Sequence, residues 1–142
     1  MNFRKGLVLD YKTVAALLQD RSLLHMLEKY EGQVDFRTPA ICLELASQAV
    51  ENRIQHRGGN LADVSNAQEK LSRLVALIDA EVYEQFEDAA RERLPGDEFN
   101  HWPIVAAALA YDNAIWSDDE IFLGCGVSTW TTRTVELYMK HI

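Results

Sequence analysis

The segment that most constrains the fold lies in the last third of the chain. The alanine-rich stretch Trp102–Tyr111 predicts a helix, with Pro103 in its first turn and small side chains for close packing on a sheet. Ala114–Ser117 then predicts a short buried strand, which the carboxylates Asp118 and Asp119 follow directly. Ligands and catalytic groups collect where the strands of an open α/β sheet end, so Asp119 is a candidate site residue.

Short apolar runs alternate with helical patterns along the rest of the chain. Strands are predicted at Gly6–Asp10, Val34–Thr38 and Val127–Thr132, and helices at Thr13–Leu18, Ser22–Tyr30, Asn66–Leu77, Tyr83–Arg93 and Thr134–His141, with Val75–Ile78 fitting a short strand equally well. This alternation predicts an α/β fold with a central, mostly parallel sheet and helices on both faces. A length of 142 residues suits a single domain over 1–142.

A further helix is predicted to begin at Thr38-Pro39. Ile41, Leu45 and Ala49 follow at a spacing of four, which predicts that they form its buried face. Glu44 lies in the N-terminal half of this helix. An unpaired buried carboxylate is costly, so Glu44 is expected either to serve as a ligand or to pair with an arginine such as Arg53.

The composition is that of a globular protein with a substantial core, 48% hydrophobic and 25% charged. The net charge of −8 argues against the large basic footprint of a duplex-binding protein. It does not exclude a metal-dependent nuclease, because a bound cation changes the local charge. Cys42 and Cys125 fit no zinc pattern and are expected to be free, buried thiols. Without a signal peptide or a run approaching roughly 18 apolar residues, we expect a soluble cytoplasmic protein with no membrane partner.

Acidic residues recur at predicted strand ends and helix starts. Hard cations such as Mg²⁺ or Mn²⁺ prefer oxygen ligands, and when bound they activate water and stabilise a phosphoryl transition state. Capping of the next helix is the commoner role of a single Asp after a strand, so each acid alone is ambiguous. The same holds for His101, which either neighbours a helix cap or binds metal. The candidate acids are Asp10, Glu44, Asp97, Glu98, Asp118 and Asp119.

Four segments occur in a characteristic order and spacing. They are Leu7-Val8-Leu9-Asp10, then Thr38-Pro39-Ala40-Ile41-Cys42-Leu43-Glu44-Leu45, then His101-Trp102-Pro103 with the alanine-rich helix, and finally Ile115-Trp116-Ser117-Asp118-Asp119 before Phe122, Gly124, Gly126 and Val127. Over nearly the whole chain these segments resemble the PIN domain family of metal-dependent ribonucleases. The resemblance implies a three-layer α/β/α sandwich.

The resemblance also implies roles for individual residues. Asp10, Glu44 and Asp119 match the family's metal-binding acids, with Mg²⁺ or Mn²⁺ as the implied ion. Ser117 matches a small hydroxyl residue that supports the site by hydrogen bonding. These four are therefore the candidate catalytic residues.

Three positions depart from the family pattern. Asn100-His101 stands where an Asp usually precedes Trp-Pro, so Asp97 or Glu98 is the expected substitute. His101 itself is a poor ligand for Mg²⁺ but acceptable for Mn²⁺ or Zn²⁺. Lys12 replaces a small polar residue two positions after Asp10, and Ile121 replaces an acid that often follows the last metal ligand.

Two functions remain open at this point. The resemblance implies an endoribonuclease acting on RNA, like the toxins of toxin–antitoxin modules. An antitoxin would then cover the site, placing an arginine among its carboxylates, and a homodimer is implied as well. The alternative is a catalytically impaired PIN-like domain that binds protein or RNA, with the ammonium of Lys12 neutralising the acids in place of a metal.

Overall fold

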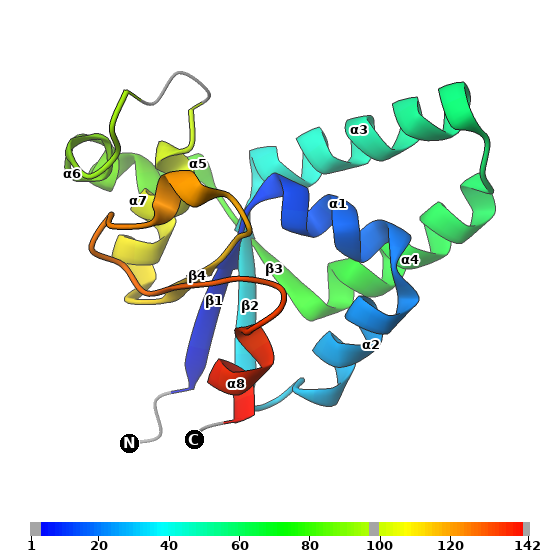
Figure 1. The fold of residues 1–142 in the computed structure, drawn as a ribbon, viewed down its shortest axis with the longest axis horizontal. Helices are drawn as coiled ribbons and strands as arrows, with labels where there is room; N and C mark the ends of the chain where they lie inside the picture. The colour runs from blue at the N-terminus through cyan, green and yellow to red at the C-terminus, as the bar shows by residue number, and fades with distance from the viewer. Residues whose placement is uncertain (1–3, 97–99, 141–142) are drawn as a thin grey trace.

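A parallel sheet forms the centre of the fold. The structure is a computed structural model that describes residues 4–96 and 100–140. Within them, five parallel strands make one sheet in the order β3-β2-β1-β4-β5 (Figure 1). The strands are β1 (Lys5–Leu9), β2 (Val34–Pro39), β3 (Val75–Ile78), β4 (Ala114–Trp116) and β5 (Thr129–Trp130). The predicted parallel sheet is confirmed, and its middle strand is the first in the sequence.

One face of the sheet is covered by helices from the first half of the chain together with the last helix. Alternate side chains of a strand point to opposite faces, and Leu7, Leu9 and Trp116 point to this one. The helices that pack there are α1 (Tyr11–Gln19), α2 (Arg21–Lys29), α3 (Ala40–Arg57), α4 (Leu61–Leu74) and α8 (Val135–Lys140). In Figure 1, α3 and α4 extend together away from the sheet.

The opposite face carries the remaining helical segments. Val8 and Ile115 point to this face and are fully buried there. The segments that cover it are α5 (Ala80–Tyr83), the 3₁₀ turn η1 (Glu84–Phe86), α6 (Glu87–Glu92), α7 (Trp102–Tyr111) and a second 3₁₀ turn, η2 (Glu120–Phe122). The two helical layers and the sheet between them confirm the expected three-layer α/β/α sandwich. None of the described helices is both long and apolar enough to cross a membrane.

The helix α7 has the predicted bounds and packs closely on the sheet. Ala106 and Ala107 are fully buried, which small side chains allow when a helix lies close to a sheet. Asp112 follows the helix in a left-handed conformation, with φ of 53°, and its backbone N–H bonds back to the last turn. The chain then turns directly into β4.

The predicted buried face of α3 is wrong. The buried residues of this helix are Cys42, Ala46 and Val50. Ile41 and Leu45 are each 42% exposed, and Ala49 is exposed as well. Both rows have a spacing of four residues, so apolar periodicity alone did not separate them, and close packing of α3 against α1 selected the row with the smaller side chains.

Several other elements have bounds that differ from the sequence prediction. The predicted helix Tyr83–Arg93 is broken into α5, η1 and α6. Val75–Ile78 is a strand, which was the alternative prediction for this segment. The helix α4 begins earlier than predicted because Asn60 Oδ1 accepts a hydrogen bond from the Ala62 N–H at 2.8 Å and so caps the helix. Within Val127–Thr132, β5 occupies only Thr129–Trp130. The two cysteines are free and buried, as expected.

The orientation of α3 can be tested with two matched substitutions. Ala46→Leu forces extra volume into a fully buried position and is expected to lower the free energy of unfolding by about 1–3 kcal/mol. Ala49→Leu adds the same atoms at an exposed position and is expected to change it by less than about 0.5 kcal/mol. Urea unfolding followed by circular dichroism measures both. An equal cost in the two variants would contradict this orientation.

Candidate active site

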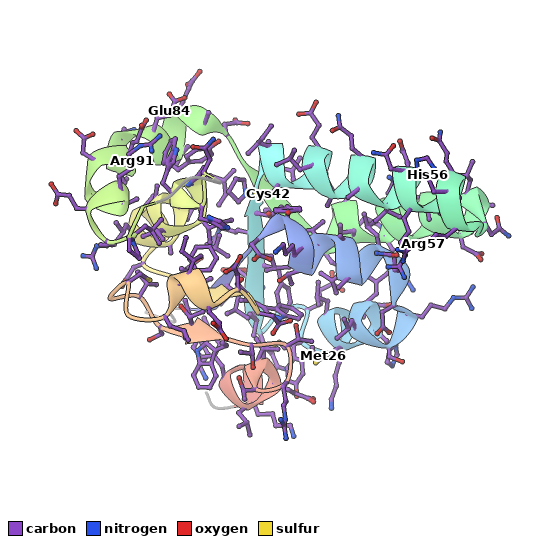
Figure 2. All side chains as sticks on the ribbon, turned by 45° about the horizontal axis from the view of Figure 1, so that its top comes forward. Met26, Cys42, His56, Arg57, Glu84 and Arg91 are labelled. Atoms are coloured by element: carbon purple, nitrogen blue, oxygen red, sulfur yellow. The ribbon has the colours of Figure 1, made fainter. Side chains whose placement is uncertain are left out.

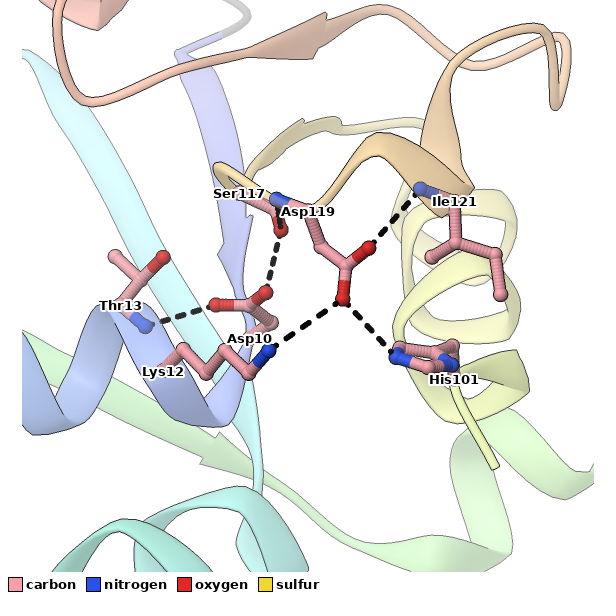
Figure 3. A network of polar contacts seen from close by, with 7 residues as sticks. All are labelled: Asp10, Lys12, Thr13, His101, Ser117, Asp119 and Ile121. Atoms are coloured by element: carbon pink, nitrogen blue, oxygen red, sulfur yellow. Dashed lines mark hydrogen bonds and ion pairs between the residues drawn. The ribbon is translucent and has the colours of Figure 1, made fainter. Parts of the chain in front are cut away.

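Asp10 lies at the carboxyl end of the central strand β1 and is 5% exposed. It caps α1, since its Oδ1 accepts a hydrogen bond from the Thr13 backbone N–H at 2.8 Å. Its Oδ2 accepts from the hydroxyl of Ser117 (Figure 3). Each oxygen of this carboxylate therefore has a protein donor that fixes its orientation.

Ser117 directly follows β4, the strand beside β1, and is 1% exposed. The carboxyl ends of neighbouring parallel strands meet at one edge of a sheet, which places Ser117 beside Asp10. While the Ser117 hydroxyl donates to Asp10, its Oγ accepts from the Asp119 backbone N–H at 3.0 Å. One buried hydroxyl thus joins the two candidate acids.

Asp119 completes this edge of the sheet and remains partly accessible, with 23% of its side chain exposed. Its Oδ1 accepts from the Ile121 N–H at 3.0 Å and caps η2. Its Oδ2 faces two nitrogens, Lys12 Nζ at 3.8 Å and His101 Nε2 at 3.3 Å (Figure 3). The carboxylate is therefore oriented by the backbone on one oxygen and approached by cations or donors on the other.

Asp118 has a different role, although it neighbours Asp119 in sequence. Its two oxygens accept from the N–H and the hydroxyl of Thr132, each at 2.8 Å. The same hydroxyl accepts from the indole N–H of Trp116 at 3.1 Å. Asp118 therefore joins the end of β4 to the chain that follows β5.

A cavity of about 220 Å³ opens over the acids. Asp10, Asp119, Lys12 and His101 form its polar side, and the lining also includes Asn100, Ile41, Cys42 and Leu45. Burial, together with the negative charge of Asp10, raises the pKa of the Cys42 thiol to about 12. Cys42 is therefore a neutral thiol at physiological pH and not an activated nucleophile.

The structure brings some of the predicted site residues together and leaves others apart. Asp10, Ser117, Asp119 and His101 are joined by the contacts above. Glu44 is exposed on α3 and does not line the cavity, so the prediction that its carboxylate is buried was wrong. Within the described residues, Glu44 makes no ion pair with Arg53 either. Asp97 and Glu98 lie outside the described residues.

Thr13 and Thr38 also support the site, although neither was predicted to be a site residue. The Thr13 hydroxyl donates to the carbonyl of Trp116 at 3.2 Å, and the Thr38 hydroxyl donates to the carbonyl of Leu9 at 2.7 Å. Both are buried. Thr13 lies three positions after Asp10, in the helical turn that Asp10 was expected to cap. This spacing could have identified Thr13 as a residue close to the site.

The donor set is compatible with a divalent cation. Asp10 and Asp119 supply hard oxygens with lone pairs beyond those used by the protein donors, and Mg²⁺ is commonly held by one or two carboxylates with water completing its shell. Within residues 4–96 and 100–140, no group of three or more His, Cys, Asp or Glu side chains is placed to hold a metal ion. A cation bound here would therefore depend on two acids from the described part of the chain.

The bridging role of Ser117 leads to a prediction for stability. Ser117→Ala leaves the buried Asp10 carboxylate without one of its donors and is expected to lower the free energy of unfolding by about 1.5–3 kcal/mol. Ser128→Ala, at an exposed position in the same part of the chain, is the matched control and is expected to be nearly neutral. Urea unfolding at neutral pH measures both variants. Equal stability of the two variants would show that the bridge contributes nothing.

Comparison with known proteins assigns the fold to a family. A family model described as a PIN domain matches residues 8–140, a span that includes both acids and all of β2 to β5. No curated protein matches the chain at a significant level. The PIN domain is a nuclease fold whose members generally depend on divalent metal. The match covers almost the whole chain and agrees with the three-layer fold built on a parallel sheet, and the chain therefore belongs to the PIN domain family.

Proposed function

We propose that this protein is a metal-dependent endoribonuclease that hydrolyses RNA phosphodiester bonds. The observation that carries the proposal is the pair of carboxylates, Asp10 and Asp119, which come from neighbouring strand ends and are joined by the Ser117 hydroxyl. The pair borders a cavity, and the family to which the chain belongs is a family of nuclease folds.

In this proposal Asp10 and Asp119 hold Mg²⁺ or Mn²⁺. When bound, such an ion activates water and offsets the charge that develops on the phosphoryl group. The residues around the acids keep them in position: the Thr13 N–H and Ser117 hydroxyl orient Asp10, and the Ile121 N–H orients Asp119. Positioning of this kind reduces the reorganisation needed during reaction.

Further ligands belong to the proposal as well. Glu44 lies between Ile41 and Leu45 on α3, and these two residues line the cavity, whereas Glu44 itself does not. On the family resemblance alone, we assign Glu44 as a third acid, and Asp97 or Glu98 as a substitute for the family acid that this chain lacks before Trp102-Pro103. An imidazole ligand favours Mn²⁺ over Mg²⁺, so His101 beside Asp119 makes Mn²⁺ the better candidate ion.

The biological setting is proposed from the family resemblance. We assign the protein to the cytoplasm as the toxin of a toxin–antitoxin module, acting as a homodimer. An antitoxin would inhibit it by placing an arginine against Asp10 and Asp119, where a guanidinium pairs with carboxylates through two parallel hydrogen bonds. The partial exposure of the Asp119 side chain, 23%, supports such a contact.

Two neighbouring aspartates provide a test of the proposed activity. Asp119→Asn is expected to reduce metal-dependent cleavage of single-stranded RNA by at least about 100-fold, because the site loses a charge that holds the cation. Asp118→Asn, which changes only the contact with Thr132, is expected to retain most of the activity. A chelator should abolish cleavage by the wild type. Similar activity in both variants would contradict the proposed site.

A second function is favoured by one specific contact. The ammonium of Lys12 lies 3.8 Å from Asp119 Oδ2, where it supplies positive charge without a metal. A domain with this arrangement would keep the fold as an RNA-binding or protein-binding module while losing catalysis. Lys12 therefore separates the two functions experimentally.

Thermal shift with Mn²⁺ distinguishes the two functions. For a nuclease, Mn²⁺ is expected to raise the melting temperature of the wild type but not of Asp119→Asn. Lys12→Ser should bind Mn²⁺ about fivefold more tightly, since a competing charge near 4 Å is worth about 1 kcal/mol in water. Lys140→Ser, an exposed change on α8, is the control. If the wild type shows no shift and Lys12→Ser gains one, the impaired domain is the correct assignment.

A further inference from the structure

A groove continues from the acidic cavity along two helices. It has a volume of about 520 Å³, lies between α1 and α3, and shares Tyr11 and Lys12 with the cavity over the acids. Figure 1 shows α1 and α3 running side by side away from the sheet, and the two helices are in contact. The groove therefore leads outward from Asp10 and Asp119.

The wall on the α3 side is formed by the row of residues that was predicted to be buried, which begins with Ile41, Leu45 and Ala49. Ile41 and Leu45 line the cavity, and the same row continues through Ala49 to Arg53, which line the groove. At 1.5 Å per residue, Leu45 and Arg53 are about 12 Å apart along the helix. Figure 2 shows this direction, with Cys42 at the end of α3 beside the sheet and His56 and Arg57 at its far end. The opposite wall comes from Ala15, Ala16 and Gln19 of α1.

The groove carries positive charge on a protein whose net charge is −8. Lys12 lies at the end next to the acids, and Arg53 lines the groove from α3. Arg53 is exposed and forms no ion pair or side-chain hydrogen bond within the described part of the chain. The groove also contains Asp20, but one of its oxygens accepts from the N–H groups of Ser22 and Leu23, at 2.9 and 3.3 Å, and caps α2. Arg53 thus remains available for an anion.

We infer that this groove takes the RNA strand as it leaves the acids, with the guanidinium of Arg53 contacting a backbone phosphate. The inference rests on the proposed function and adds the path of the substrate. A guanidinium recognises phosphate oxygens in a bidentate manner. Lys12 and Arg53 supply positive charge for an RNA backbone, while the alanines of the two walls offer only small apolar side chains to a protein partner. Phosphate recognition therefore explains the groove better than peptide recognition.

The test measures RNA binding separately from cleavage. Protein is titrated into a fluorescein-labelled single-stranded RNA of twelve nucleotides and mixed sequence, in a buffer that contains a chelator to prevent metal-dependent cleavage. Binding is measured by fluorescence anisotropy over a range of salt concentrations. Arg53→Glu is expected to weaken binding about tenfold, and to reduce the slope of log affinity against log salt by about 0.7 for the one lost phosphate contact. The control is Arg73→Glu, which makes the same charge change at an exposed position of α4 beside a different cavity. It is expected to bind within twofold of the wild type.

Two results of the binding experiment would overturn the inference, and the cleavage experiment below adds a third. One is equal binding by Arg53→Glu and Arg73→Glu, which would leave the groove to a protein partner or to no partner at all. The other is no RNA binding by the wild type. A cleavage assay on the same RNA in the presence of Mn²⁺ tests the proposed nuclease activity independently of binding. If the wild type cleaves and Arg53→Glu cleaves with the same KM, the path is wrong while the nuclease assignment stands. If binding depends on Arg53 but the wild type does not cleave, the nuclease assignment is wrong while the groove remains an RNA-binding surface.

Discussion

The hydrogen bond between Ser117 and Asp10 is the contact on which the arrangement of the site depends. It exists because β1 and β4 are parallel neighbours in a register that pairs Leu9 with Trp116, so the next residue of each strand meets the other. Two buried threonines reinforce this edge: Thr13 bonds the carbonyl of Trp116, and Thr38 bonds the carbonyl of Leu9. A buried carboxylate without such donors would be strongly destabilising. The core of the sheet and the chemistry of its edge therefore depend on the same strand pairing.

The charge around Asp119 bears directly on the metal binding that we propose. Its Oδ2 is approached by Lys12 from α1 and by His101 from the start of α7, two elements far apart in sequence. A cation bound by the acids would share this small space with the ammonium of Lys12. Two carboxylates joined by one hydroxyl still supply the oxygen ligands that a hard divalent ion prefers. In the proposed function, competition between Lys12 and a metal would therefore separate a nuclease from a binding module.

The orientation of α3 connects the fold to the surface beside the site. Because Cys42, Ala46 and Val50 face inward, the row from Ile41 to Arg53 lies at the surface. Along this row, the apolar side chains of Ile41 and Leu45 lie beside the acids, and Ala49 and then the cationic Arg53 follow farther along the helix. The row of α3 that was predicted to be buried therefore lines the cavity and the groove instead. The exposure of Ile41 and Leu45, which is unfavourable for a simple core helix, follows from their place at the mouth of the cavity.

Local patterns in the sequence determined the elements and the ends at which acids occur. Trp102–Tyr111 has the bounds of α7, and Asp10 and Asp119 were expected at strand ends because runs of apolar residues stop there. Periodicity could not choose between two rows of α3 that share a spacing of four. The family resemblance had already selected Asp119 over Asp118, and the structure gives these two acids different partners. The tertiary structure decided the row and these partners, together with the position of Lys12 beside Asp119 and the exposure of Glu44. Each depends on which surfaces pack against one another, and contacts between residues distant in sequence are set by strand pairing and helix packing rather than by local propensity.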